Sequence, residues 1–506
     1  MDKVLENDLM TVDVAKQADR VRNMLRHPGN LLIGGEWVVP QSATSLVTSD
    51  PGSGIPLIDF PLGDVADIGA AVAAARDALP VWRATPPLQR AAALWRLADL
   101  IEASIEDFAL LETLDTGKPL DHSLNYDMPS AINNFRYMSG MASRLTGTQP
   151  PLATHPAGLF HSYIRLEPIG VVGAIIPWNF PLAGAAAKIA PALACGNTLV
   201  VKPSEQTPLT MLRFGELLEE AGIPPGVVNI VTGDGSTGAA LTRHPGVNKI
   251  TFTGSTATGQ AIAKIAADNM TRVSLELGGK SPNVIFADAD IDAAIAGAAA
   301  AIYWDSGEVC SAGSRLYVER TVLDRVLEGL RKTVDAMPIG HGLEANTAIG
   351  PLISHDHLQK VAGYVDHGRS EGIEVAFGGE VVDRAGHFYR PTALLGAAPD
   401  SAILTEEIFG PVVGVVPFDD TDQVINASND SAYGLAAGVW TRDIAKAHYF
   451  ADRVEAGVVW VNTYGIVDPA MPWGGFKKSG WGRENSEQVI HEYTEPKGVV
   501  VFTGTA

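Results

Sequence analysis

The chain has 506 residues, of which 46% are hydrophobic and 19% charged, so it is long enough for several domains with large cores. A formal net charge of −21 argues against a nucleic-acid-binding protein, because such proteins typically carry an excess of basic residues. No apolar run reaches the length of a membrane span. Two cysteines are too few for a disulfide framework, and the acidic N-terminus does not resemble a signal peptide. These features predict a soluble cytoplasmic protein without nucleic-acid or membrane partners.

The first third of the chain predicts a strand hairpin followed by helices. Residues 1–28 are polar and indicate a helical or loosely attached extension. Residues 31–37 (LLIGGEW) have a strand–turn–strand pattern with Gly-Gly at the turn. Apolar residues then recur at helical spacing in three stretches, which are 67–79, 87–114 and 130–145.

From about residue 167 the pattern changes to alternating strands and helices. Strand-like runs stand at 170–177, 197–203, 227–233, 249–254 and 273–277. Near-continuous Val/Ile runs of this kind are typical of a parallel sheet that is covered by helices on both faces. Such sheets bind ligands beyond the carboxyl ends of their strands, so we expect an α/β fold with its chemistry in those loops.

Three of these loops carry groups that suit a dinucleotide or an oxyanion. The loop from Gly254 to Gly259 opens a helix whose free amides suit a pyrophosphate, although a purely structural turn is the alternative. Lys202 and Glu205 can hold ribose hydroxyls or simply form an exposed ion-bearing loop. Asn179 offers an amide donor to a developing oxyanion, and a turn before Phe-Pro is its alternative role.

Glu276 and Cys310 lie near the two ends of the stretch 273–315. Glu276 ends a short apolar run, and Cys310 follows an alanine-rich helix and a turn of small residues. A carboxylate in apolar surroundings and a thiol in an open turn are the groups that a covalent thiol enzyme needs. From this stretch alone, a structural glutamate and a core cysteine are the alternative.

Seven motifs extend these observations from about residue 30 to the end of the chain. They are IPWNFPL (176–182), VKPSE (201–205), FTGSTATG (252–259), LELGGKSP (275–282), GEVCSAGSR (307–315), EEIFGPVV (406–413) and PWGGFKKSG (472–480). In this order they resemble the NAD(P)-dependent aldehyde dehydrogenase superfamily. Glu276 and Cys310 are 34 residues apart, which is the family's own spacing.

The resemblance implies a catalytic centre made of Asn179, Glu276 and Cys310. Cys310 would attack the aldehyde carbon as thiolate, and the Asn179 side chain with the Cys310 backbone N–H would hold the oxyanion. Hydride transfer to NAD would leave a thioester, and Glu276 would activate the water that hydrolyses it. Relatives that pass the acyl group to coenzyme A usually lack this glutamate, so the free carboxylic acid is the expected product. Lys188 matches a lysine linked to proton relay, with a solvated helix charge as the alternative.

The resemblance also implies NAD as the cofactor, with NADP less favoured because Glu205 opposes a 2′-phosphate. Lys202 and Glu205 match ligands of the adenosine ribose. Ser255 matches the pyrophosphate turn. Glu407 and Phe409 match the residues that hold the nicotinamide ribose and ring. The full expected set is Ile176, Pro177, Trp178, Lys202, Ser204, Glu205, Gly235, Gly254, Ser255, Gly278, Glu407 and Phe409. No metal site is expected, because the histidines form no paired cluster.

The substrate tunnel is expected to be wide. Relatives that prefer small aldehydes carry large side chains at the positions of Gly184 and Ala187. The expected lining is Phe180, Gly184, Ala187, Trp304, Val309, Val467 and Trp473. This favours a bulky hydrophobic or aromatic aldehyde, and residues 468–472 also resemble phenylacetaldehyde-type relatives. The alternatives are an amino-aldehyde such as betaine aldehyde, or a structural relative without catalysis.

Two residues depart from the family pattern before the nucleophile. Asp305 and Glu308 stand where the family commonly has Asn and Gln. Their negative charge is expected to oppose formation of the Cys310 thiolate unless it is paired elsewhere.

The resemblance and the strand pattern together imply an aldehyde dehydrogenase fold in three parts. Residues 1–145 and 168–278 are expected to form a Rossmann-like NAD-binding domain, and 279–478 an α/β catalytic domain. Residues 146–167 and 479–506 are expected to form a small bridging sheet. Its last strand would be an exposed apolar edge without a partner, so a homodimer or homotetramer is expected.

Overall fold

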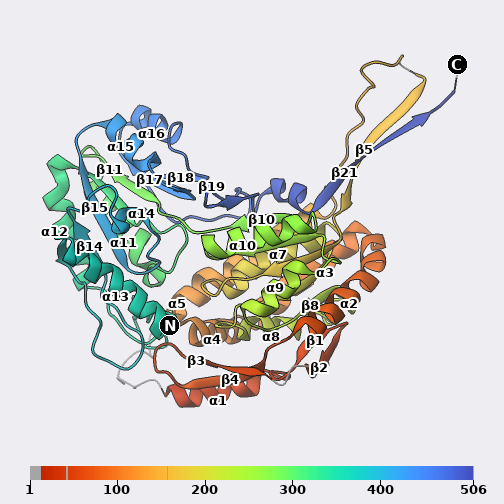
Figure 1. Cartoon of the computed structure of the whole chain (residues 1–506), viewed down its shortest axis with the longest axis horizontal. Coiled ribbons are helices and arrows are strands. Elements are labelled where there is room, and N and C mark those ends of the chain that lie inside the picture. Colours follow the sequence, from red (N-terminus) through yellow and green to blue (C-terminus); the bar gives the residue numbers. More distant parts are fainter. Residues whose placement is uncertain (1–12, 41–43, 157, 505–506) are drawn as a thin grey trace, which may run out of the picture.

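The computed structural model describes residues 13–40, 44–156 and 158–504, which are organised around two large sheets (Figure 1). The first sheet has, in spatial order, strands β2 (Glu36–Val38), β1 (Leu31–Ile33), β8 (Val228–Ile230), β7 (Thr198–Lys202), β6 (Val171–Ile175), β9 (Lys249–Thr253), β10 (Arg272–Glu276) and β20 (Gly480–Trp481). The inner strands from β8 to β10 are parallel, whereas β1, β2 and β20 are antiparallel additions at the edges. The predicted parallel strands are therefore confirmed.

Alternate residues of the inner strands face two different cores. In β7, Leu199 and Val201 point to one core and Val200 points to the other, because successive side chains of a strand alternate between its faces. The helices that cover the first face are α3 (Pro87–Ala103), α6 (Met128–Met141) and α7 (Pro181–Ala194). The second face is covered by α2 (Val65–Ala84), α9 (Gly235–Arg243) and α10 (Thr256–Asp268). Burial on both faces explains the near-continuous apolar runs.

The predicted hairpin of residues 31–37 is formed by β1 and β2. Gly34 and Gly35 both have positive φ, at 66° and 86°. Glycine adopts this conformation without a steric penalty, so the chain reverses within two residues and Leu31 pairs with Val38.

The second sheet follows the same α/β logic. Its strands, in spatial order, are β13 (Glu374–Phe377), β14 (Thr392–Leu395), β15 (Val412–Phe418), β12 (Arg315–Glu319), β11 (Pro282–Ile285), β17 (Ala436–Trp440) and β18 (Val458–Val461). All neighbours are parallel except β13 and β14. Its helices are α11 (Ile291–Tyr303), α12 (Leu323–Asp335), α13 (His355–Ser370), α14 (Ala402–Thr405), α15 (Thr421–Asn429) and α16 (Ile444–Ala451).

Several further α-helices and β-strands lie outside these two sheets and the helices named so far. They are α1 (Val14–Met24), β3 (Ser45–Ser49), β4 (Pro56–Pro61), α4 (Ile105–Thr116), α5 (Leu120–His122), α8 (Leu209–Gly215), β16 (Tyr433–Gly434) and β19 (Phe476–Lys477). The predicted N-terminal extension thus includes helix α1, while residues 1–12 lie outside the described residues. In the described ranges, no helix combines the length and apolar character needed to cross a membrane.

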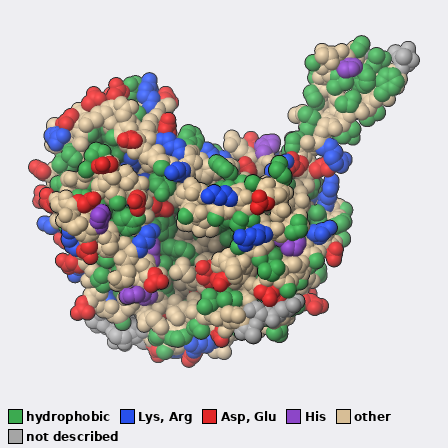
Figure 2. Space-filling model, viewed as in Figure 1, with side chains coloured by type: hydrophobic (Ala, Val, Ile, Leu, Met, Phe, Trp, Pro, Cys, Tyr) green, Lys and Arg blue, Asp and Glu red, His purple; other side chains and the backbone are tan. Residues whose placement is uncertain are grey.

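A two-stranded arm projects from the body of the molecule (Figure 1). It consists of β5 (Phe160–Pro168) and β21 (Thr494–Phe502), which pair antiparallel along their whole length. Val500, Val501 and Phe502 near its tip are exposed, and Figure 2 shows hydrophobic side chains over much of the arm. Strand β20 pairs instead with β10, so part of the segment 479–506 extends the first sheet. The division into three domains stays a prediction.

Candidate active site

Two cavities meet around Asn179, Glu276 and Cys310, and these three residues line both of them. The first cavity lies at the carboxyl ends of the parallel strands of the first sheet, and all twelve residues expected around a cofactor line it. The second cavity lies between α6, α7 and the segments that contain Trp304, Val467 and Trp473. All seven residues expected in the tunnel line this second cavity. The structure therefore brings together every predicted site residue.

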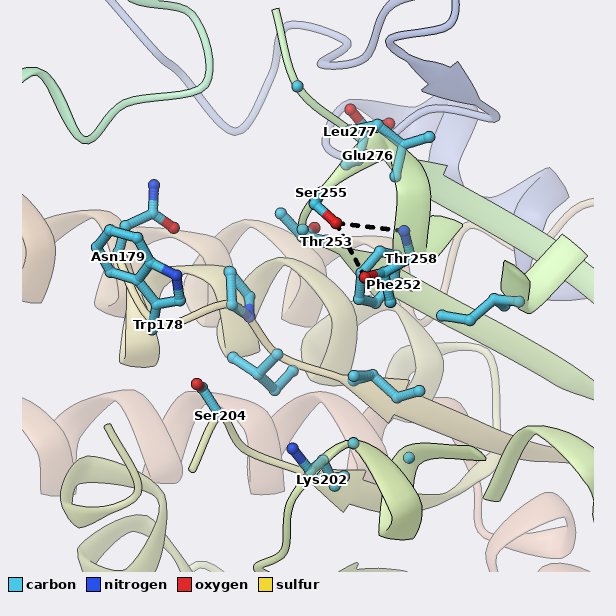
Figure 3. Close-up of a pocket in the computed structure, with 18 of the residues that line it drawn as sticks. Trp178, Asn179, Lys202, Ser204, Phe252, Thr253, Ser255, Thr258, Glu276 and Leu277 are labelled. Atoms are coloured by element: carbon cyan, nitrogen blue, oxygen red, sulfur yellow. Dashed lines mark hydrogen bonds between the residues drawn. The ribbon is translucent and has the colours of Figure 1, made fainter. Parts of the chain in front are cut away.

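The parallel direction of the strands explains how distant motifs converge. Asn179 follows β6, Lys202 ends β7, and Glu276 ends β10, so all three arise at the same edge of the sheet. Ser255 caps α10 beyond the end of β9. Its hydroxyl accepts a hydrogen bond from the Thr258 N–H (3.2 Å) and donates one to Thr258 Oγ1 (2.9 Å), as Figure 3 shows. The first turn of α10 lines the first cavity. The positive end of the helix dipole there can bind an anion.

The groups that line the first cavity fit a dinucleotide. Lys202 is buried, and its Nζ lies 2.8 Å from Glu205 Oε2, so the pair is a part-buried element of the cavity wall rather than an exposed ion-bearing loop. Glu407 Oε1 accepts a hydrogen bond from the Gly279 N–H (2.9 Å). A side chain on Gly278 would collide with the Glu407 carboxylate, so glycine is needed for this approach. Within the described ranges, no group of three or more His, Cys, Asp or Glu is placed to hold a metal ion.

Phe409 is held in an uncommon backbone conformation at the edge of this cavity. Its φ is +62°, which non-glycine residues seldom adopt unless the surroundings impose it. The Trp178 ring meets the Phe409 ring edge-on at 5.3 Å, and His357 Nε2 donates to the Phe409 carbonyl oxygen at 2.6 Å. These contacts fix the Phe409 ring beside the first cavity.

Glu276 is a buried carboxyl group without a partner. Neither carboxyl oxygen makes a hydrogen bond in the described part of the chain. Burial raises the pKa of Glu276 well above its ordinary value, the nearby Glu484 raises it further, and Lys188 and Arg483 oppose this. A carboxyl group of this kind can exchange a proton with a reactant near neutral pH.

Lys188 and Glu484 form a buried pair beside Glu276. Lys188 is fully buried, and its Nζ donates to Thr253 Oγ1 (2.6 Å) and pairs with Glu484. The alternative of a solvated helix charge is therefore wrong. Glu484 lines the second cavity and was missed in the sequence, because nothing local distinguishes it from a surface glutamate.

Asp305 and Glu308 each have partners elsewhere, which is the condition under which their charge was expected not to oppose the Cys310 thiolate. Asp305 lies 3.3 Å from Lys118 Nζ and accepts a hydrogen bond from His122 Nδ1 (2.6 Å). Burial alone would raise the pKa of Asp305. Lys118 and His122 outweigh burial and lower it. Burial raises the pKa of Glu308 well above its ordinary value, and Glu308 Oε1 accepts a hydrogen bond from the Ile353 N–H (3.0 Å). Both acids therefore have partners of their own, and the main acids that raise the pKa of Cys310 are others.

Cys310 is half-buried, and its thiol is strongly held in the protonated form. Burial raises the pKa of Cys310 to about 12, Glu407 and Glu276 add to this, and a hydrogen bond from the Ser311 backbone opposes it. The acids that raise the pKa of Cys310 are thus other residues than Asp305 and Glu308, which the sequence had singled out. Glu276 is the last residue of β10, and Glu407 lies in the segment after α14.

Lys118 holds the segment that carries Asn179. Its Nζ donates to Asp127 Oδ2 (2.6 Å) and to the Asn179 carbonyl oxygen (2.7 Å). From the other side, Asn179 Nδ2 donates to the Glu308 carbonyl oxygen (2.8 Å). Asn179 is therefore positioned through both its backbone and its side chain. The sequence did not predict this role for Lys118.

We expect Glu407→Gln to increase the reactivity of the Cys310 thiol. Removing a negative charge near the sulfur stabilises the thiolate, so the pKa of Cys310 falls and alkylation at a fixed pH becomes severalfold faster. The measurement is the rate of alkylation by iodoacetamide against pH, followed at Cys310 by mass spectrometry. Glu406→Gln is the matched control, because Glu406 is not among the main groups that shift the pKa of Cys310. Equal rates for the two variants would contradict the argument.

Comparison with known proteins agrees with this geometry. The model of the aldehyde dehydrogenase family matches residues 37–499. The chain is 45% identical over 484 residues to a phenylacetaldehyde dehydrogenase of Pseudomonas fluorescens, covering 94% of this chain and 96% of that protein. It is 40% identical over 476 residues to a betaine aldehyde dehydrogenase of Rhizobium johnstonii, covering 93% and 97%. A solved NAD+ complex of an aldehyde dehydrogenase from Bacillus cereus matches with a TM-score of 0.93 at 42% identity, covering 96% of this chain and 99% of that one. The chain therefore belongs to the aldehyde dehydrogenase family and is an NAD-dependent aldehyde dehydrogenase.

Proposed function

We propose that this dehydrogenase oxidises bulky hydrophobic or aromatic aldehydes to the carboxylic acids. The observation that carries the proposal is the wall of the second cavity, hereafter the tunnel, whose volume of about 340 Å³ lies within the usual range for ligand pockets. The Phe180 and Trp304 rings stack at 5.9 Å, and Tyr126 meets Trp304 edge-on at 4.7 Å. On the same cavity wall, the small residues Gly184 and Ala187 leave space that a larger side chain would fill.

The proposed roles of the three central residues follow from their positions. Cys310 attacks the aldehyde carbon, since it is the thiol that reaches both cavities. The Asn179 Nδ2 group and the Cys310 backbone N–H stabilise the oxyanion. Glu276 in its ionised form takes a proton from the water that hydrolyses the thioester, and its raised pKa makes it an effective base.

The residues of the first cavity are proposed to hold NAD. Lys202 and Glu205 bind the adenosine ribose, the first turn of α10 at Ser255 binds the pyrophosphate, and Glu407 with Phe409 holds the nicotinamide riboside. When bound, NAD supplies the hydride acceptor for the oxidation. Glu205 disfavours the 2′-phosphate of NADP by like charge.

The arm is proposed to associate with a second copy of the chain in a homodimer or homotetramer. Its exposed Val500, Val501 and Phe502 on β21, which pairs with β5 alone among the described strands, support this proposal. The two free cysteines are consistent with a reducing, cytoplasmic location.

An amino-aldehyde such as betaine aldehyde is the second candidate substrate. The Tyr126, Trp304 and Trp473 rings in the tunnel can attract a quaternary ammonium by cation–π interaction. An ionised carboxylate free to pair with such a cation is missing from the described tunnel lining, because Glu484 is paired with Lys188 and the pKa of Glu276 is raised by burial. This weighs toward an uncharged substrate.

The test is the rate of NADH formation with phenylacetaldehyde, hexanal, acetaldehyde and betaine aldehyde, in the wild type and in Ala187→Leu. We expect phenylacetaldehyde to have the highest kcat/KM. Filling the tunnel in Ala187→Leu is expected to lower that value by about 10-fold or more, with little change for acetaldehyde. Ala70→Leu, at an exposed position of α2, controls for the substitution itself. A wild-type preference for betaine aldehyde or acetaldehyde would overturn the substrate proposal, and no NADH from any aldehyde would favour a relative without catalysis.

A further inference from the structure

Two amide side chains interrupt the apolar wall of the tunnel, and the chemistry at Cys310 uses neither of them. Asn134 and Asn485 both line the tunnel, and each residue is only 4% exposed. The side-chain oxygens of both are buried and have no hydrogen-bond partner among the described residues. A buried amide without partners is destabilising, and buried polar groups in proteins are almost always paired. Two such groups on one cavity therefore indicate a ligand that pairs with them.

Asn134 is fixed in place by the helix that carries it. On α6, Ile132, Phe135 and Met138 all pack into the core beneath the first sheet. The helix cannot rotate without exposing these three side chains to solvent. Asn134 therefore stays on the side of α6 that borders the tunnel.

Asn485 is held at the tunnel wall by a strained backbone. Its φ is +57°, and the φ of the next residue, Ser486, is +54°. Two hydrogen bonds of 2.8 Å join the backbone of the preceding Glu484 to Trp473, and the Ser486 N–H donates to the Pro469 carbonyl oxygen at 2.7 Å. Consecutive non-glycine residues at positive φ persist only where such contacts impose them, and they are frequent at binding sites. The segment that places Trp473 in the tunnel thus also places Asn485 there.

The chemistry of an amide indicates what would pair with it. Each amide offers a donor and an acceptor, and with no protein partner either end can turn toward a ligand. A hydroxyl group is both donor and acceptor, so it can pair with either end of a side-chain amide. An ammonium group could donate to the amide oxygens, but its charge would not be neutralised by Glu484, which is already paired with Lys188. A carboxylate group would be placed near the acids Glu276 and Glu484, and an alkyl group would leave both amides unpaired.

We propose that Asn134 and Asn485 form a specificity subsite for a hydroxyl group on the substrate, so that the preferred substrate is a hydroxyaryl aldehyde. This inference rests on the proposed function, because it names a narrower class of aromatic aldehyde for the same tunnel. Asn134 and Asn485 act on substrate choice and take no part in the bond changes at Cys310. Sites that hydrogen-bond a substrate hydroxyl discriminate strongly against analogues that lack it.

The test compares kcat/KM for phenylacetaldehyde with that for its 3-hydroxy and 4-hydroxy derivatives. In the wild type we expect at least one hydroxylated aldehyde to be preferred by about 10-fold or more. In the double variant Asn134→Leu with Asn485→Gly we expect this ratio to fall close to one. Glycine at position 485 tolerates the positive φ, so the amide is removed while the backbone is kept. Asn133→Leu, at the exposed neighbouring position of α6, is the matched control and should keep the wild-type ratio.

The outcomes separate the two proposals. Turnover of all three aryl aldehydes with equal kcat/KM in the wild type would overturn the hydroxyl subsite and leave the aromatic substrate class intact. A hydroxyl preference that persists in the double variant would also overturn it. Turnover of betaine aldehyde without turnover of any aryl aldehyde would overturn the proposed function, and the subsite with it.

Discussion

Replacing Cys310 by alanine is expected to abolish aldehyde oxidation, with kcat falling on the order of 10⁴-fold or more, as for other enzymes that lose their nucleophile. The two cavities share part of their wall, and Cys310 is one of the residues that line both. Without this thiol, the substrate carbon has no covalent attachment beside the cofactor cavity. Glu276 and Asn179 remain in the variant, but their proposed roles require a substrate that is bound to the sulfur.

The matched control is Cys195→Ala. Cys195 is fully buried in the core beneath the first sheet, and burial raises the pKa of Cys195 to about 12. Alanine is close to cysteine in size, so we expect this variant to fold and to keep its activity. The measurement is the rate of NADH formation with phenylacetaldehyde for the wild type and both variants. It tests whether Cys310 is the nucleophile. Comparable rates for Cys310→Ala and Cys195→Ala would show that the thiol of Cys310 is not the nucleophile.

The parts of the fold and site that could be predicted are those with local signals. A strand buried on both faces has a continuous apolar run, so β6, β7 and β9 were visible in the sequence. The residue at the end of such a strand lies at the ligand-binding edge whatever its distant neighbours are. For this reason Asn179, Lys202 and Glu276 could be placed around one site without coordinates, and the family resemblance added Cys310.

The parts that could not be predicted depend on pairing over long distances in sequence. The sequence shows that Asp305 and Glu308 are acids, but it does not show that Asp305 pairs with His122, 183 residues away. It does not show that burial raises the pKa of Glu308. The same holds for Lys188 and Glu484, which are 296 residues apart. An acidic residue near a nucleophile in sequence therefore predicts little about the reactivity of the nucleophile until the partners of the acid are known.

Replacing Lys118 by methionine is expected to have the largest effect on stability. Lys118 lies among three buried carboxyl groups, at 2.6 Å from Asp127, 3.3 Å from Asp305 and 4.0 Å from Glu112. Burial opposes its charge, but these acids outweigh burial and raise the pKa of Lys118 above its ordinary value. Removing one partner of a buried ion pair leaves charge uncompensated, so we expect the free energy of unfolding to fall by about 3–5 kcal/mol.

The loss of stability in Lys118→Met should grow as the pH rises. Lys118 lowers the pKa values of Glu112, Asp127 and Asp305, so its removal raises all three in the folded protein. A carboxyl group with a raised folded pKa destabilises the fold when ionised and ceases to do so when protonated. The stability deficit of Lys118→Met should therefore be larger at about pH 8 than at about pH 5, where more of the carboxyl groups are protonated. Urea-induced unfolding at the two pH values measures the difference.

The matched control is Arg320→Met, which breaks an ion pair of good geometry in a different environment. Arg320 and Asp419 make two hydrogen bonds of 2.8 Å, but both side chains are exposed, so water already compensates their charges. We expect little loss of stability and no change in activity from this variant. Lys118→Met should in addition lower kcat, because the Asn179 carbonyl oxygen loses the donor that positions the oxyanion amide. Equal stability of the two variants would contradict the argument from burial, and an unchanged kcat in a folded Lys118→Met protein would show that Asn179 is positioned by its bond to the Glu308 carbonyl oxygen alone.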